Sequence, residues 1–181
     1  MARTILKKKR PESDLLHGKG FFRIVITQDS DSWVICEPKT SYNHRSSVIE
    51  NLTGRAYSEK QLSFTGLRDL IHKGLDRKAF DRFRDGAGIS TEELCIIAGI
   101  PKRTLSRRDR FKPEESDRIF RVASAFQKTV EVLENLGAAR KWFSTPKKAL
   151  DGLTPLQCCD TETGAREVED LLGRIEHGVF A

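Results

Sequence analysis

The chain has 181 residues, 32% of them charged, and carries a formal net charge of +6 at pH 7. Its length suits one compact body with a core of its own and an additional N-terminal piece. No run approaches the roughly 18 apolar residues of a membrane span, and the basic N-terminus lacks the apolar stretch of a secretory signal. These features argue against a membrane-spanning or secreted protein and predict a cytoplasmic one.

Residues 1–60 are expected to form an N-terminal extension. The stretches FFRIVITQ and WVICE are rich in aromatic and β-branched residues and are separated by DSDS, so they favour a short β-hairpin. Residues 38–63 carry proline, glycine, asparagine and many serines. This composition is typical of a linker with at most a short helix around VIENL.

Helical patterns become dense near Gly66. The stretch GLRDLIHKG predicts a helix that ends at Gly74, and DRKAFDRFRDG predicts one that ends at Gly86. A capping box then predicts a helix start at Ser90, because Ser90 and Glu93 can satisfy each other's free amides.

The segment LCIIAGIPKRTLSRR has the pattern of a helix, a tight turn and a second helix. Gly99 permits a left-handed backbone at the turn, while Ile100 and Leu105 supply apolar contacts between the two helices. A second helix that begins at Pro101 carries its basic and hydroxyl side chains opposite Leu105. Residues 101–112 contain six basic residues and one acidic residue, a local charge of +5.

In helix-turn-helix proteins the second helix enters the major groove, where arginine pairs with guanine and hydroxyls reach phosphates. We expect Arg108 to lie on the Leu105 side and to pair with an acid of the long helix that follows. The alternative is an ordinary packing corner with a solvated basic face. The predicted DNA-binding residues are Lys102, Arg103, Thr104, Ser106 and Arg107.

The stretch PEESDRIFRVASAFQKTVEVLENLG repeats apolar residues at steps of three or four and predicts the longest helix of the chain. Pro113 suits its first turn and Gly137 suits its end. Lys112 stands where a small capping residue is usual, so we expect a weaker helix start.

A second capping box begins at Thr154, and GAREVEDLLGRIEH predicts a last helix that Gly178 terminates. Residues 151–181 contain seven acidic and two basic residues, a local charge of −5. The apolar Val179 and Phe180 follow the helix end. They either fold back onto their own helix or contact another molecule, and the pattern alone leaves both alternatives open. Together the elements predict a mainly α-helical protein.

The stretches IPKRTLSRR, EESDRIFRVA, AARKWFSTPKKALDGLTPLQ and DTETGAREVEDLLGRIEHGVFA together resemble the Xre/MbcA/ParS family of bacterial type II antitoxins. The resemblance covers about residues 66–181. It implies an Xre-like helix-turn-helix domain, here residues 61–124, followed by a small helical toxin-binding domain, here residues 125–181. It also implies a homodimer, operator DNA that is repressed, and a RES-domain toxin that consumes NAD or transfers its ADP-ribose.

In the family, the C-terminal segment reaches into the toxin near its NAD site. We expect this tail to be mobile in the free protein and ordered in the complex, with Glu176 and the terminal carboxylate matching a cationic cleft. By position, the resemblance implies the toxin-binding residues Arg174, Ile175, Glu176, His177, Gly178, Val179 and Phe180.

The sequence leaves two alternatives to an antitoxin function, an enzyme and a transcriptional regulator. An enzyme needs a nucleophile and a base, and the best candidate pair is Cys158 or Cys159 with His177, which no spacing forces together. We therefore predict no catalytic residue and no cofactor. The other alternative is a stand-alone helix-turn-helix transcriptional regulator without a toxin partner.

The four cysteines and four histidines favour neither a disulfide nor a metal site. The cysteines form no CxxC pair, and adjacent cysteines bridge poorly, so we expect reduced thiols. The histidines are scattered, which predicts no metal ligand set. These residues are Cys36, Cys95, Cys158 and Cys159, and His17, His44, His72 and His177.

Overall fold

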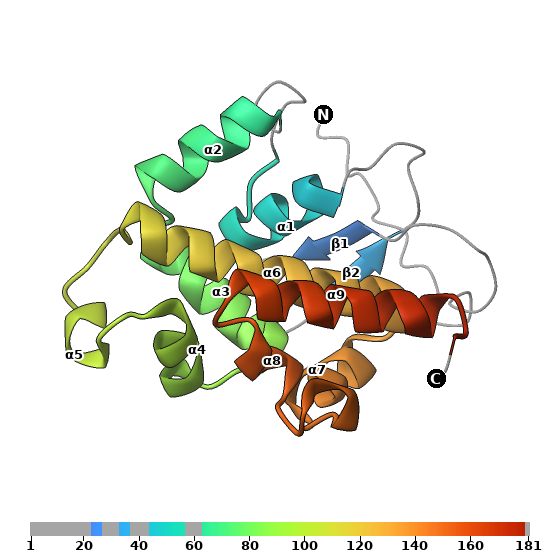
Figure 1. Cartoon of the computed structure of the whole chain (residues 1–181). Helices are drawn as coiled ribbons and strands as arrows, with labels where there is room; N and C mark the ends of the chain where they lie inside the picture. Colours follow the sequence, from blue (N-terminus) through green and yellow to red (C-terminus); the bar gives the residue numbers. More distant parts are fainter. Residues whose placement is uncertain (1–22, 27–32, 37–43, 57–62, 180–181) are drawn as a thin grey trace, which may run out of the picture.

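A computed structural model of the chain describes residues 23–26, 33–36, 44–56 and 63–179. Figure 1 shows helices gathered around one long helix, α6, and the predicted mainly α-helical class is confirmed. The α-helices are α1 (His44–Thr53), α2 (Phe64–Lys73), α3 (Arg77–Ala87), α4 (Thr91–Ala98), α5 (Lys102–Leu105), α6 (Pro113–Leu133), α7 (Leu136–Ser144), α8 (Pro155–Cys158) and α9 (Glu162–Glu176). A short 3₁₀-helix, η2 (Lys148–Leu150), precedes α8.

Two short strands precede the helices. β1 (Arg23–Ile26) and β2 (Trp33–Cys36) pair antiparallel, with Arg23 opposite Cys36 and Ile26 opposite Trp33. They occupy the position of the predicted β-hairpin. The residues that join the strands, 27–32, lie outside the described part of the chain.

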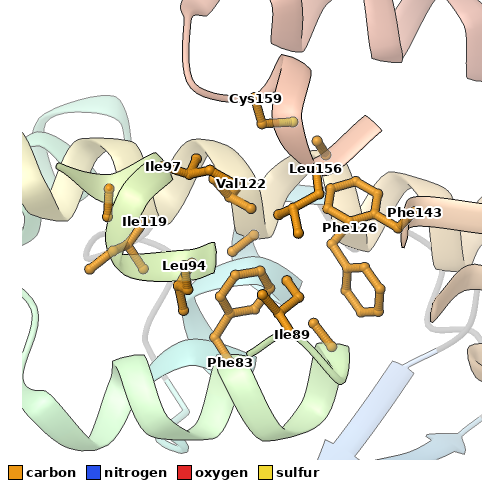
Figure 2. Close-up of a cluster of buried hydrophobic side chains, with 14 of the residues drawn as sticks. Phe83, Ile89, Leu94, Ile97, Ile119, Val122, Phe126, Phe143, Leu156 and Cys159 are labelled. Carbon is orange, nitrogen blue, oxygen red and sulfur yellow. The ribbon is translucent and has the colours of Figure 1, made fainter. Parts of the chain in front are cut away.

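The core is continuous around α6. Figure 2 shows side chains of α3, α4, α6, α7 and the α8 region pointing toward one another. The ring of Phe126 on α6 packs edge-on against Phe83 of α3 and against Phe143 of α7, with centroid distances of 6.1 and 5.4 Å. The boundary predicted between residues 124 and 125 therefore falls inside a continuous helix whose buried face belongs to one core.

The N-terminal helix α1 is part of this core. Val48, Ile49 and Leu52 are buried, and the buried Asn51 Nδ2 donates to Gln127 Oε1 of α6 at 3.0 Å. The short helix expected around VIENL is thus present. However, it packs against α6 and α3 and does not act as a linker.

Two helix ends differ from the predictions. α3 runs through Gly86 to Ala87, and Gly88 adopts the left-handed conformation that ends it. The long helix does not end at Gly137. It ends at Leu133, where Glu134 takes a left-handed conformation with φ of 51°.

The reason for the early end of α6 lies in the next residue. The Asn135 side chain accepts from the backbone N–H of Ala138 at 2.8 Å and so caps a new helix, α7, which contains Gly137.

None of the helices in the described ranges combines the length and apolar character needed to cross a bilayer.

Candidate functional sites at the two ends of the molecule

The turn between α4 and α5 is built as the sequence predicts. The Ser90 hydroxyl accepts from Glu93 N, and the Glu93 carboxylate accepts from Ser90 N, so the capping box that starts α4 is confirmed. Gly99 has φ of +66°, and a Cβ at this position would collide with the Arg118 guanidinium of α6. Ile100 N donates to the Cys95 carbonyl at 2.8 Å and closes the turn. A side chain at position 99 would therefore strain the backbone and require the Arg118 guanidinium to move.

The second helix of this motif is shorter than predicted. α5 spans only Lys102–Leu105, so Ser106 is its C-terminal cap and Arg107 lies beyond it. The Leu105 carbonyl at its end accepts a bond from Arg77 Nη1 of α3 at 2.6 Å. The chain then turns into an extended segment, in which Phe111 N donates to the Leu75 carbonyl at 2.9 Å.

The predicted DNA-binding side chains lie together on and just after α5. Lys102, Arg103, Ser106 and Arg107 are exposed. Thr104 is half-buried and its hydroxyl donates to the Pro101 carbonyl, so it is less free than its neighbours. Lys102 Nζ lies 3.6 Å from an exposed Glu92 carboxylate. Within the described ranges, Arg103 and Arg107 form no ion pair, which leaves both guanidinium groups open to an external anion.

Arg108 has the structural role that the sequence predicted. Its Nη1 donates to both carboxylate oxygens of Glu115 on α6, at 2.6 and 2.7 Å. Glu115 is buried, with an exposed fraction of 6%, and also accepts from Lys112 N at 2.8 Å. The helix start that lacks a small capping residue at Lys112 is therefore held by Glu115.

Lys73 is a further exposed cation that the fold places beside the basic segment. The segment that contains Arg110 and Lys112 pairs with residues beside Gly74, and Arg110 Nη1 donates to the Gly74 carbonyl at 2.8 Å. Lys73 adjoins this glycine, and Lys73, Arg110 and Lys112 are all exposed. The local charge pointed to positions 110 and 112, but Lys73 lies more than thirty residues earlier, and only the fold brings it there.

The second predicted site is the end of α9. The N–H of Gly178 donates to the Ile175 carbonyl at 3.2 Å, and the N–H of Val179 donates to the Arg174 carbonyl at 2.9 Å. With Gly178 at φ of +67°, these bonds form a Schellman motif, and the predicted terminating role of Gly178 is confirmed. Both Gly178 and Val179 are bonded to the last turn of the helix, and the mobility expected of the tail in the free protein stays a prediction.

The exposure of Val179 decides between the two alternatives for this residue. A Schellman motif is usually completed by an apolar contact between the residue after the glycine and the third residue from the helix end. Here that third residue is Arg174, and Val179 remains 57% exposed. Val179 therefore does not fold back onto its own helix, whereas Phe180 lies outside the described residues.

The other predicted residues of the tail differ in their surroundings. Arg174 and His177 are exposed, and Ile175 is half-buried. Glu176 is bound within the chain, because Lys128 Nζ of α6 donates to its Oε2 at 2.8 Å. This bond holds the pKa of the Glu176 carboxyl below its ordinary value of 4.5, and Glu176 is accordingly a carboxylate near neutral pH.

The cysteine and histidine groups do not form a catalytic pair. Burial raises the pKa of the Cys159 thiol to about 12 and also raises that of Cys158. His177 stands at the far end of the 15-residue helix α9, roughly 20 Å from its start. Within the described part of the chain, no three His, Cys, Asp or Glu side chains gather as a metal ion would require.

The two candidate sites lie at opposite ends of the molecule. Figure 1 shows α5 beyond the N-terminal end of α6 and the end of α9 near the other end. Because α6 has 21 residues, it separates them by roughly 30 Å. The fold therefore defines a helix-turn-helix protein. Its helix-turn-helix part ends with α6, and the same helix continues into a C-terminal helical domain.

Comparison with known proteins identifies the family. Residues 66–124 match the antitoxin Xre-like helix-turn-helix domain, and residues 129–178 match the antitoxin Xre/MbcA/ParS C-terminal toxin-binding domain. The chain thus belongs to the Xre/MbcA/ParS antitoxin family, and the resemblance noted from its motifs is confirmed. The two matches meet inside α6, so one helix carries the end of the first domain and the start of the second.

Three relatives named Antitoxin Xre support this assignment. The protein from Yersinia enterocolitica is 42% identical over 122 residues, which cover 65% of this chain and 82% of the relative. The protein from Photorhabdus laumondii is 32% identical over 120 residues, 64% of this chain and 81% of the relative. The protein from Pseudomonas putida is 32% identical over 145 residues, 72% of this chain and 91% of the relative.

Proposed function

We propose that this chain is a cytoplasmic antitoxin that binds and neutralises a cognate RES-domain toxin through residues 174–180. The observation that carries the proposal is the end of α9. This end belongs to the matched toxin-binding domain, is bonded in a defined conformation, and presents the apolar Val179 to solvent. An exposed apolar residue on a preorganised backbone binds a partner without a large loss of conformational entropy.

The charge of the C-terminal half supports the same partner. Residues 151–181 carry a net charge of −5, and Glu167, Glu169 and Asp170 are exposed on α9. A cleft that binds the phosphates of NAD is cationic, so an acidic helix is attracted to it while Val179 enters an apolar part. The chain itself is proposed to have no catalytic role.

Truncation in co-expression tests this function. The toxin gene is expected beside the gene of this chain, and full-length antitoxin should restore growth of cells that express the toxin. A chain that ends after His177 should fold, with an unchanged circular dichroism spectrum, yet fail to rescue. Equal rescue by both chains would remove the tail from the mechanism. A neighbouring gene that encodes no RES-type protein would count against this proposal and would favour the alternative, a stand-alone transcriptional regulator.

We further propose that the other end of the molecule binds operator DNA as a homodimer and represses its own operon. The support is the cluster of exposed cations at α5, where Arg103 and Arg107 are the best placed side chains. A one-turn helix presents few base contacts, so phosphate contacts by Lys73, Arg110 and Lys112 would supply much of the affinity.

The separation of the two sites makes joint binding feasible. A toxin at the end of α9 lies roughly 30 Å from α5, along α6. The toxin complex should therefore bind the operator as well. In a gel-shift experiment, toxin added to the antitoxin–DNA complex should produce a slower band, and release of free DNA by the toxin would contradict this arrangement.

A further inference from the structure

We infer that Lys128 is a positioning residue for toxin binding, because it holds Glu176 and thereby fixes the direction in which α9 presents Val179. The inference rests on the proposed antitoxin function. It assigns Glu176 to a contact within its own chain, in place of the direct contact with the toxin that its position in the tail implied.

The contact is short and comes from a fixed support. Lys128 Nζ lies 2.8 Å from Glu176 Oε2, and the two residues are 48 positions apart. Lys128 stands in the C-terminal half of α6, between Gln127 and Thr129, whose side chains are both buried. Because its neighbours are packed, the position from which Lys128 reaches α9 is rigid.

A second ion pair holds the other end of the same helix. Arg121 of α6 lies 3.1 Å from Glu162, the first residue of α9, and Glu176 is the last. Arg121 and Lys128 are seven residues apart on α6, two helical turns, so they project on the same side of that helix. α9 is therefore attached to α6 at both ends, and the two helices run in the same direction.

The hydrogen bonds at the end of α9 fix the position of the tail relative to the helix. Val179 N donates to the Arg174 carbonyl and Gly178 N to the Ile175 carbonyl, both in the helical turn that contains Glu176. A rotation or fraying of that turn would move Val179 with it. The ion pair at Lys128 thus acts on Val179 through the backbone, although neither Lys128 nor Glu176 needs to touch the toxin.

A charge exchange tests the assignment. Toxin affinity is measured for the full-length chain, for Lys128→Glu, for Glu176→Lys, and for the double variant Lys128→Glu/Glu176→Lys. Each single variant should bind about threefold to tenfold more weakly, because it places like charges together at the helix end. The double variant restores the pair with opposite polarity and should return to within about twofold of the original affinity.

Matched variants control for net charge. Lys141→Glu and Glu114→Lys make the same changes of charge at exposed positions outside both sites, and should alter toxin affinity by less than about twofold. If Glu176→Lys weakens binding and the double variant does not recover, Glu176 contacts the toxin and the inference is wrong. Full affinity of Lys128→Glu would also overturn it.

A measurement without toxin separates this inference from the proposed function. The amide of Val179, bonded to Arg174, should exchange faster with solvent in each single variant and recover protection in the double variant. Unchanged exchange in Lys128→Glu would contradict the positioning role. If the original chain binds no toxin, the proposed function fails, whereas the exchange experiment still decides whether Lys128 orders the tail.

Discussion

Buried polar residues at the start of α6 join the two halves of the helix-turn-helix domain. The Ser116 hydroxyl accepts from Leu75 N at 2.9 Å and donates to the Lys112 carbonyl at 2.8 Å. Beside it, Glu115 receives Arg108 and Lys112 N. The buried side-chain oxygens of Ser116 and Glu115 all have hydrogen-bond partners, so a substitution that removes one partner leaves a buried polar atom unsatisfied and lowers stability.

Replacement of Ser116 by alanine should show this cost. The Leu75 N–H would lose its buried acceptor, so the free energy of unfolding should fall by about 1–3 kcal/mol in urea denaturation. Ser144→Ala is the control, because that hydroxyl is exposed and donates only to carbonyls at the end of α7. Equal effects of the two substitutions would show that the bond to Leu75 contributes no net stability.

The adjacent arginines 107 and 108 should separate stability from DNA binding. Arg108→Ala leaves the buried Glu115 carboxylate without its guanidinium, so unfolding free energy should fall by about 2–3 kcal/mol. Arg107→Ala should leave stability within about 0.5 kcal/mol and weaken operator binding. The opposite assignment of the two effects would contradict the roles described for these side chains.

The thiols of Cys158 and Cys159 should be unreactive in the native chain. Burial raises the pKa of Cys159 from 9.0 to about 12, so the thiolate forms only under strongly alkaline conditions and not near neutral pH. Iodoacetamide near pH 7 should modify both residues in concentrated urea but not in buffer, as mass spectrometry of peptides would show. Rapid modification of Cys159 by iodoacetamide in the folded protein would support the alternative that this chain is an enzyme with a cysteine nucleophile.

At the scale of elements, the capped helix starts and the helix ends at Gly74 and Gly178 followed from the sequence, whereas the ends of α5 and α6 did not. The starts at Ser90 and Thr154 depend on side chains that bond within three residues, which a local pattern contains. The end of α6 depends on Glu134 in a left-handed conformation, which few residues other than glycine adopt, and the apolar repeat that continues to Leu136 concealed the cap that Asn135 provides for α7. The carbonyl of the last residue of α5 accepts from Arg77 of α3, a contact that no local pattern contains.

The same distinction applies to the candidate sites. The cations of α5 and the termination by Gly178 could be predicted, since charge and glycine spacing are local. The bond between Lys128 and Glu176 could not be predicted, because the chain contains many lysines and acidic residues that could pair. Only the packing of α9 on α6 brings these two side chains together. The contribution of α1 to the core was missed for a similar reason.

The unusual backbone at Glu134 offers a stabilising substitution. Glu134→Gly should raise the free energy of unfolding by about 0.5–1 kcal/mol, since glycine adopts φ near +51° without steric cost. Glu134→Ala keeps a Cβ and should bring no such gain. Thermal unfolding of both variants is the measurement, and equal stability of the two would mean that the left-handed backbone is not strained.

At the scale of the whole molecule, charge is divided between the two ends. Residues 101–112 carry +5 and residues 151–181 carry −5, and Figure 1 shows α5 beyond the N-terminal end of α6 and α9 alongside this helix. The acidic end repels nucleic acid, so DNA should approach from the α5 side alone. This polarity keeps the toxin and DNA surfaces from competing for one ligand.

Operator binding should depend steeply on salt. With about three phosphate contacts from each chain, the logarithm of the binding constant should fall with the logarithm of salt concentration with a slope near −3 per chain. Lys73→Ala and Lys112→Ala, which remove proposed phosphate contacts, should each reduce the slope by about one. Fluorescence anisotropy over a range of potassium chloride concentrations measures it, and a slope near zero would contradict a basic DNA-binding surface.

The continuity of α6 limits how members of this family can exchange halves. A chimera that joins the helix-turn-helix part of one chain to the C-terminal part of another must be spliced within this helix, where one inserted residue rotates everything beyond it by about 100°. Lys128 would then point away from α9, and Phe126 would leave the core. Recombination that gives an old DNA-binding half a new toxin specificity should therefore succeed only with crossovers that conserve the helical phase of α6.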